Sequence, residues 1–394
     1  MDTSIVNTTS SGSTRAILKL VREKLVLTLL DKSLLFPYYI IYYRFSIDNN
    51  ISCDESGMEE EVPMKKLLSL LVALSMIAEV LWAGGKKEAP ASTQKFTLRI
   101  STVISTSDPM YKGYAFLAEN LGKRTNGAIQ ATVYPDAQLG QDEDVMEQAL
   151  LGADVAFNTD AGRLGVRVKQ MGIVLAPYLF ENPAEAKKFL LSDLFKGWQK
   201  ELQEKHNLVL LALNYYAGGR NFVTKKPVLS PDDLKGMRIR TPGAPVWQES
   251  IRSMGATPVA LPWVETYPAL QQGVIDGAEA QHPATFGAKL FEVAKNISLT
   301  NHILLMNGPV VGAKWFNQLP KEFQDILFEE AIKAGDFVTQ TVLDLEKDYE
   351  KKMAAGGATI HTVDAKPFKE KAQNAYVALG LVELKKEVEK VLGK

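Results

Sequence analysis

Two arginines in the second half of the chain have the sequence context of anion ligands. Arg240 is the last residue of a short expected strand before Thr241-Pro242, and Arg220 follows Gly218-Gly219, a pair that lets the backbone approach another group closely. A guanidinium is a planar fork of donors that matches a carboxylate with two parallel hydrogen bonds. Neither arginine has an acidic neighbour in the sequence, so we favour a bound anion over pairing with a surface acid.

Four further side chains are expected beside these arginines. Ser107 closes the region of the first strand, and Thr159 and Asp160 follow the expected strand at 155–157. Loops at strand ends line the crevice of an α/β sheet, although turn formation is an equal alternative for each of these polar residues. Trp263 lies between a strand and a helix, where its ring is suited to wall a pocket; packing in the core is the alternative.

The sequence shows little sign of enzyme chemistry. It contains no G-x-S-x-G, H-E-x-x-H, P-loop or G-x-G-x-x-G motif, its four histidines lack metal-ligand spacing, and its one cysteine is Cys53. The acidic run Asp142-Glu143-Asp144 opens an expected helix, where carboxylates offset the macrodipole. The 45 basic and 46 acidic residues balance, so no global field attracts nucleic acid. We therefore expect no enzyme, no cofactor, no metal ion and no nucleic-acid partner.

The first 85 residues differ in character from the rest. Met64-Lys65-Lys66, the apolar run 67–77 and the small residues 83–85 have the order of a secretory signal peptide, which we assign to 64–85. The apolar run is shorter than the ~20 residues that a membrane span needs. We expect 1–63 to be a mis-called or disordered extension, because Glu59-Glu60-Glu61 before Met64 would look like a translated ribosome-binding sequence.

From Phe96 onward, strand and helix patterns alternate, which is typical of an α/β fold with mostly parallel sheets. The chain is expected to pass from a first α/β unit to a second near 214–222 and to return near 303–315, so we expect two lobes joined by a hinge. We place 96–215 and 303–394 in the first lobe and 216–302 in the second, with one larger doubly wound domain as the alternative. A single apolar stripe over 321–353 predicts a helix of ~45 Å, longer than the ~30 Å of a small lobe and therefore able to brace both.

Three motifs point to a family: YPDAQLG (134–140), LKGMRIRTP (234–242) and PWVETYPALQQGVIDGAE (262–279). On these motifs, residues 96–392 resemble the extracytoplasmic solute-binding proteins of tripartite ATP-independent periplasmic (TRAP) transporters, the dicarboxylate-binding DctP type. The resemblance implies the two-lobed periplasmic binding protein fold with a hinge, a cleft and a long bracing C-terminal helix. It also implies that Arg240 pairs bidentately with a ligand carboxylate, that Arg220 matches a second arginine of the sialic-acid-binding branch, and that Trp263 is the aromatic residue of the site.

The chain departs from the family's pattern at one place. Many members carry Asn after Asp-Gly-x-Glu, where this chain has Ala280 followed by Gln281. We include both residues among the candidate ligand-binding positions, at the ligand's distal end, and expect specificity to differ there.

The resemblance implies a periplasmic receptor, exported through a cleaved signal peptide, that binds a small organic anion. The ligand would be a mono- or dicarboxylate, delivered to the membrane permease subunits of a TRAP transporter. Two alternatives stay open: a ligand-sensing receptor for a membrane sensor kinase, and a secreted enzyme acting on carboxylic acids. Neighbouring permease or kinase genes distinguish the first two, and turnover of screened acids tests the third.

Overall fold

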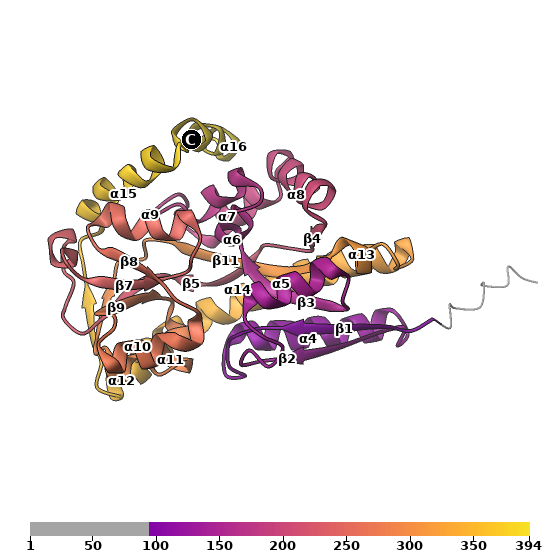
Figure 1. Ribbon diagram of the computed structural model, residues 1–394, viewed down its shortest axis with the longest axis horizontal. Coiled ribbons are helices and arrows are strands. Elements are labelled where there is room, and N and C mark those ends of the chain that lie inside the picture. The colour runs from indigo at the N-terminus through magenta and orange to yellow at the C-terminus, as the bar shows by residue number, and fades with distance from the viewer. Residues whose placement is uncertain (1–93) are drawn as a thin grey trace, which may run out of the picture. The chain divides into compact units, whose positions relative to one another are not determined.

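The computed structural model describes residues 94–394 (Figure 1). The extension predicted at 1–63 and the signal peptide predicted at 64–85 lie outside the described residues. Within 94–394, no helix has both the length and the apolar character needed to span a membrane.

The first of two six-stranded sheets has the order β2-β1-β3-β11-β4, with β5 also pairing with β11. Its strands are β1 (Phe96–Ser101), β2 (Ile129–Tyr134), β3 (Val155–Asp160), β4 (Leu208–Leu210), β5 (Tyr215–Gly219) and β11 (Leu304–Gly312). β1 runs parallel to β2 and β3, whereas β11 is antiparallel to β3, β4 and β5. The helices of this part are α4 (Pro109–Arg124), α5 (Asp142–Leu151), α6 (Ala161–Leu164), α7 (Pro183–Leu190), α8 (Asp193–His206) and α13 (Ala313–Phe316).

The second sheet has the order β12-β10-β6-β9-β7-β8. Its strands are β6 (Asn221–Thr224), β7 (Arg238–Thr241), β8 (Thr257–Ala260), β9 (Gly277–Ala280), β10 (Asn296–Leu299) and β12 (Thr359–Thr362). The helices that connect them are α9 (Pro245–Met254), α10 (Thr266–Gln272), α11 (His282–Gly287) and α12 (Leu290–Val293). Helices thus alternate with strands in both sheets, and the predicted α/β class is confirmed. The sheets are mixed and not mostly parallel as expected, because β11 is antiparallel to its neighbours in the first sheet and β6 is antiparallel to β9 and β10 in the second.

The main chain passes between the two sheets at adjacent points. β5 ends at Gly219 in the first sheet and β6 begins at Asn221 in the second, so Arg220 lies at the crossing itself. The returning segment lies alongside it: Arg220 N donates to Ile303 O at 2.8 Å, and His302 N donates to Arg220 O at 3.1 Å. Gly218 has φ 125°, a conformation that a side chain disfavours, so the glycine permits the turn into this crossing.

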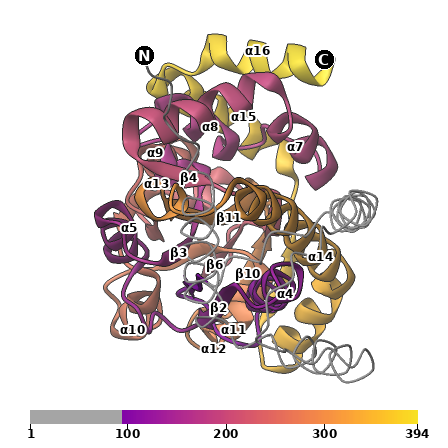
Figure 2. The same ribbon diagram turned by 90° about the vertical axis from the view of Figure 1, so that its right-hand side faces the viewer.

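The long helix α14 (Lys321–Ala355) packs against both parts of the fold, as the apolar stripe predicted. Its first half contributes Leu327, Ala334 and Val338 to the core of the first sheet. Its last turns contribute Tyr349 and Met353 to a core built on the second sheet. Figure 2 shows α14 running beside α4. At 1.5 Å per residue the helix is ~50 Å long, so one rigid element braces both sheets.

The C-terminal segment departs from the prediction that all of 303–394 returns to the first lobe. β12 instead pairs in parallel with β10 in the second sheet. The following helix α15 (Ala365–Leu379) places Phe368 in a core of the second sheet and Tyr376 in the core of the first. The last helix α16 (Val382–Leu392) adds Val388 to the first core. Sequence periodicity shows that a helix is amphipathic but not which core receives its apolar face.

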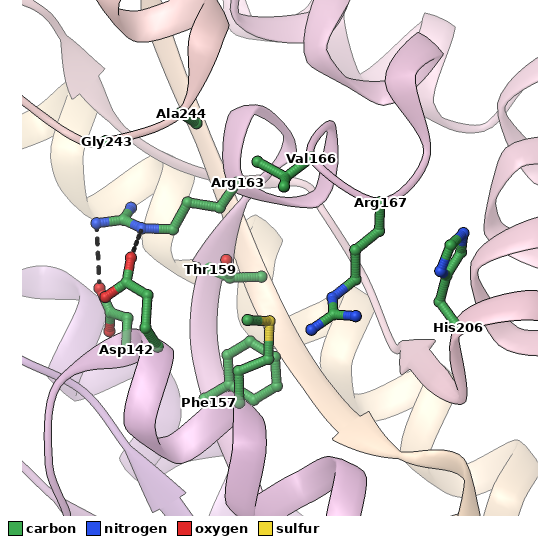
Figure 3. A pocket seen from close by; sticks show the side chains of 11 residues that line it. Asp142, Phe157, Thr159, Arg163, Val166, Arg167, His206, Gly243 and Ala244 are labelled. Atoms are coloured by element: carbon green, nitrogen blue, oxygen red, sulfur yellow. Dashed lines mark hydrogen bonds and ion pairs between the residues drawn. The ribbon is translucent and has the colours of Figure 1, made fainter.

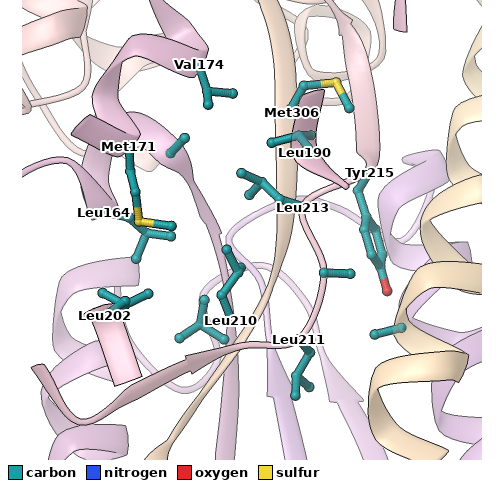
Figure 4. Close-up of a cluster of buried hydrophobic side chains, with 14 of the residues drawn as sticks. Leu164, Met171, Val174, Leu190, Leu202, Leu210, Leu211, Leu213, Tyr215 and Met306 are labelled. Atoms are coloured by element: carbon teal, nitrogen blue, oxygen red, sulfur yellow. The ribbon is translucent and has the colours of Figure 1, made fainter. Parts of the chain in front are cut away.

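The largest core lies around the first sheet (Figure 4). It gathers leucines from strand β4 and the segment after it, Leu210, Leu211 and Leu213, with Leu202 of α8 and Met306 of β11. Truncating one such side chain to alanine costs about 2–5 kcal/mol. This packing makes the first sheet a firm platform for the polar residues at its edge.

Candidate functional site

A small cavity of about 60 Å³ lies where the strand ends of both sheets meet. From the first sheet it receives side chains of β3 and β11, and from the second those of β7 and the segments that follow β7 and β9. Its polar lining consists of Asp142, Asn158, Asp160, Arg163, Arg220, Arg240, Gln281 and Asn307. Trp247 and Trp263 supply aromatic walls.

Arg240 is a buried cation that no acidic side chain of the described residues contacts directly. Its side chain is on β7, and the residue is only 2% exposed. Nε and Nη2 donate to the Leu261 carbonyl at 2.9 and 2.7 Å, and the guanidinium lies 5.3 Å from the centre of the Trp263 ring. Within residues 94–394 it forms no ion pair. Burial, and then the nearby Arg220, lower the pKa of Arg240 to about 9.

Arg220 lies in the same cavity but is already compensated. Its Nε and Nη2 contact the side chain and the carbonyl of Glu279 on β9, and Nη1 donates to Gln281 Oε1 at 2.8 Å. Glu279 is fully buried and also accepts from Thr241 Oγ1 at 2.9 Å. The Trp247 ring lies 4.9 Å from the Arg220 guanidinium. Arg220 is therefore fixed in orientation, and its charge is balanced by Glu279.

The opposite wall carries a third arginine with its own acids. Arg163 contacts Asp160 through Nη1 and Asp142 through Nη2, the latter at 3.4 Å. Asp160 also accepts from the Trp247 indole at 3.0 Å, which ties α9 of the second sheet to β3 of the first. Burial raises the pKa of Asp142 to about 6, although Arg163 acts in the opposite direction. The cavity thus has an uncompensated cation on one side and an acidic cluster on the other.

The structure places five of the eight predicted site residues on this cavity, Arg240, Arg220, Trp263, Asp160 and Gln281. It does not place the other three there. Thr159 is on β3 between Asn158 and Asp160, so strand alternation directs it to the opposite face. Ala280 alternates in the same way with Glu279 and Gln281, and it packs in an apolar core. Ser107 is exposed, and its hydroxyl lies 2.9 Å from that of Ser105.

Sequence reasoning missed Trp247, Arg163 and the cavity-facing role of Asp142. Asp142 does open helix α5, as expected, but its carboxylate also faces the cavity. The available signal for Trp247 was an aromatic residue in the first turn of the helix that follows Arg240. Arg163 follows its partner Asp160 by three residues, but its contact with Asp142 joins two different elements and had no signal in the sequence.

A catalytic or metal-binding arrangement does not emerge from these residues. No group of three or more His, Cys, Asp or Glu side chains within 94–394 is arranged to hold a metal ion. The arrangement instead suits binding of an anion: a planar donor fork, a flanking aromatic ring and partial exclusion of water.

The comparisons with known proteins agree with this arrangement. The family described as bacterial extracellular solute-binding protein, family 7 (DctP) matches residues 100–380. The sialic acid-binding periplasmic protein SiaP of Vibrio cholerae is 29% identical over 281 residues, which cover 71% of this chain and 87% of that protein.

Two solved structures extend the similarity. A TRAP periplasmic solute binding protein from Escherichia fergusonii, in an apo open form, is 39% identical with a TM-score of 0.67, covering 75% of this chain and 99% of that one. One from Ochrobacterium anthropi with bound L-fuconate is 31% identical with a TM-score of 0.73, covering 76% and 99%. The expected two-lobed binding protein fold is thereby confirmed. The chain belongs to the family 7 bacterial extracellular solute-binding proteins, the DctP type, which are periplasmic solute receptors of TRAP transporters and not enzymes.

Proposed function

We propose that this protein binds a small organic acid in the periplasm and delivers it to the membrane permease subunits of a TRAP transporter. Arg240 pairs with the ligand carboxylate through the guanidinium edge that carries Nη1, since Nε and Nη2 donate to the Leu261 carbonyl along the other edge. Arg220 and Gln281 contact the same end of the ligand, and Trp263 lies against its first carbons. The L-fuconate bound to the relative from Ochrobacterium anthropi is an organic acid of this kind, which supports the assignment.

The observation that carries the proposal is the uncompensated charge of Arg240. A buried cation is costly unless an opposite charge meets it. Arg220 and Arg163 have acidic partners inside the cavity wall, whereas within residues 94–394 the direct contacts of the Arg240 guanidinium are the Leu261 carbonyl and the Trp263 ring. An incoming carboxylate supplies the missing charge, so binding recovers a cost that the protein bears without ligand.

We also propose that ligand binding closes two lobes over this site. The first lobe is built on the first sheet and the second lobe on the second sheet, with the hinge at Gly218–Arg220 and the returning segment near 302–303. Arg240 belongs to the second lobe and Asp160 to the first, so a ligand that touches both favours the closed form. Export through a cleaved signal peptide at 64–85 would bring the mature chain to the periplasm.

The test is a thermal-shift screen on protein that has been unfolded and refolded to remove retained ligand. The panel contains sugar acids, dicarboxylates, phosphate esters and matched neutral sugars. A ligand that binds only the folded state raises the unfolding temperature. We expect carboxylates to stabilise and neutral sugars to have no effect. Stabilisation by phosphate esters alone would replace the carboxylate assignment, and stabilisation by neutral sugars would refute the anion site.

A further inference from the structure

A second and larger cavity, of about 530 Å³, lies directly beyond the Arg163–Asp142 pair (Figure 3). Both residues line this cavity and the central one around Arg240, so the two spaces are adjacent at this pair. One water molecule needs about 10–15 Å³ of cavity volume, so the 60 Å³ of the central cavity has room for only a few water molecules and suits the carboxylate end of a ligand. The larger cavity is in the size range of small-molecule pockets, about 300–1,000 Å³.

Strand β3 contributes side chains to both spaces through its alternating faces. Asn158 and Asp160 face the central cavity, whereas Phe157 and Thr159 face the larger one. The floor that Phe157 forms is continued by Met146 of α5. An apolar floor with one hydroxyl beside it is suited to the carbon body of a ligand and not to a bare ion.

The far end of this cavity carries one cation, Arg167, and one imidazole, His206. Figure 3 shows Arg167 and His206 on the side opposite the Arg163–Asp142 pair. The ion pair of Arg167 is a single contact with Glu147 at 3.3 Å, and the Glu147 side chain is 65% exposed. His206 has no side-chain hydrogen bond or ion pair to the part of the chain that the structure describes. Arg163, by contrast, is held by acids at the near end.

We propose that this cavity is a distal subsite for the far end of the same ligand. The inference rests on the proposed function, because it takes the ligand's first carboxylate to be at Arg240. The ligand then extends past Arg163, lays its carbon chain over Phe157 and Met146, and presents a second acidic group to Arg167 and His206. The ligand class is therefore an elongated organic acid with acidic groups at both ends, longer than a four-carbon diacid.

The experiment is calorimetric titration of the refolded protein with linear diacids of increasing length: succinate, adipate, suberate and sebacate. The variants are Arg167→Ala, which removes the far cation, and Val166→Trp, which fills the rim of the cavity. Arg252→Ala is the control, because Arg252 does not line this cavity and, like Arg167, has one acidic partner, Glu249. Before titration, the thermal unfolding midpoint of each variant is measured and must match that of the wild type.

For the wild type we expect affinity to rise with chain length. Arg167→Ala should weaken the best long diacid by about tenfold, the size expected for one charged hydrogen bond, and leave succinate within about twofold. Val166→Trp should act in the same direction, and Arg252→Ala should leave the whole series unchanged. A long-to-short affinity ratio that is the same in wild type, Arg167→Ala and Val166→Trp would overturn the distal subsite.

The two proposals fail in different ways. Suppose that short acids bind, that Arg240→Ala abolishes their binding, and that Arg167→Ala and Val166→Trp leave the dependence of affinity on chain length unchanged. In that case only the distal subsite is wrong. If no carboxylate binds the wild type, or if Arg240→Ala binds succinate as well as the wild type, the proposed function fails and the distal subsite fails with it.

Discussion

Arg240→Met replaces a buried cation with a flexible apolar side chain of similar length. The lowered pKa of Arg240, about 9, means that the folded state holds this proton less tightly than the unfolded chain does. The charge therefore costs stability at every pH below about 9, neutral pH included. At about 1.4 kcal/mol for each pKa unit, the cost is on the order of 5 kcal/mol. Arg240→Met also loses the hydrogen bonds to the Leu261 carbonyl and the contact with the Trp263 ring, which destabilises the variant by about 2–4 kcal/mol.

We therefore expect ligand-free Arg240→Met to be about 1–3 kcal/mol more stable than the wild type, by the difference of these terms. The assay is urea unfolding at neutral pH after ligand removal. Arg238→Met is the control: Arg238 is on the same strand but exposed, and it pairs with Asp276 at 3.0 Å. Its loss should cost at most about 1 kcal/mol. A loss of more than about 2 kcal/mol in Arg240→Met would refute the idea that this charge is a cost awaiting an anion.

Three further predictions concern residues that support the site. Glu279→Leu leaves Arg220 buried without its acid, so unfolding free energy should fall by about 3–5 kcal/mol in urea titrations; an unchanged midpoint would contradict the pairing. The raised pKa of Asp142, about 6, means that the folded state holds this proton more tightly than the unfolded chain does, and this contribution to stability is lost as pH rises from about 4 to 6. The unfolding free energy of Asp142→Asn should therefore exceed that of the wild type by about 1–3 kcal/mol at neutral pH but not at pH about 4. Equal gains at both pH values would count against this assignment. Gly218→Ala forces φ 125° on a side chain and brings its Cβ to 2.9 Å from Gln281 Cβ, so thermal unfolding should show a loss of about 1–3 kcal/mol. A wild-type melting curve would exclude strain at the crossing.

The parts of the site that are local in sequence could be predicted. Arg240 at the end of a strand, and Trp263 between a strand and a helix, are features of short segments, and the structure places both on the cavity. The long helix α14 was visible because its apolar stripe repeats at 3.6 residues over 35 residues.

The parts that depend on pairing between distant segments could not be predicted. Thr159 was expected beside Asp160, but a strand directs adjacent side chains to opposite faces, so only one of the two can face the central cavity. Ala280 was misplaced for the same reason. The partnership of Arg220 with Glu279 spans 59 residues and arises only when β9 pairs with β6. Whether an arginine is already neutralised decides its role, and sequence adjacency does not reveal it.

The account stands on the claim that Arg240 supplies the positive charge for a ligand carboxylate. The most direct measurement is calorimetric titration of wild type and Arg240→Met with the strongest carboxylate from the thermal-shift panel. Loss of a buried charged pair costs about 3–5 kcal/mol, so the dissociation constant should rise at least about a hundredfold, with Arg238→Met unchanged. An Arg240→Met protein that binds this carboxylate within about threefold of the wild type would contradict the account.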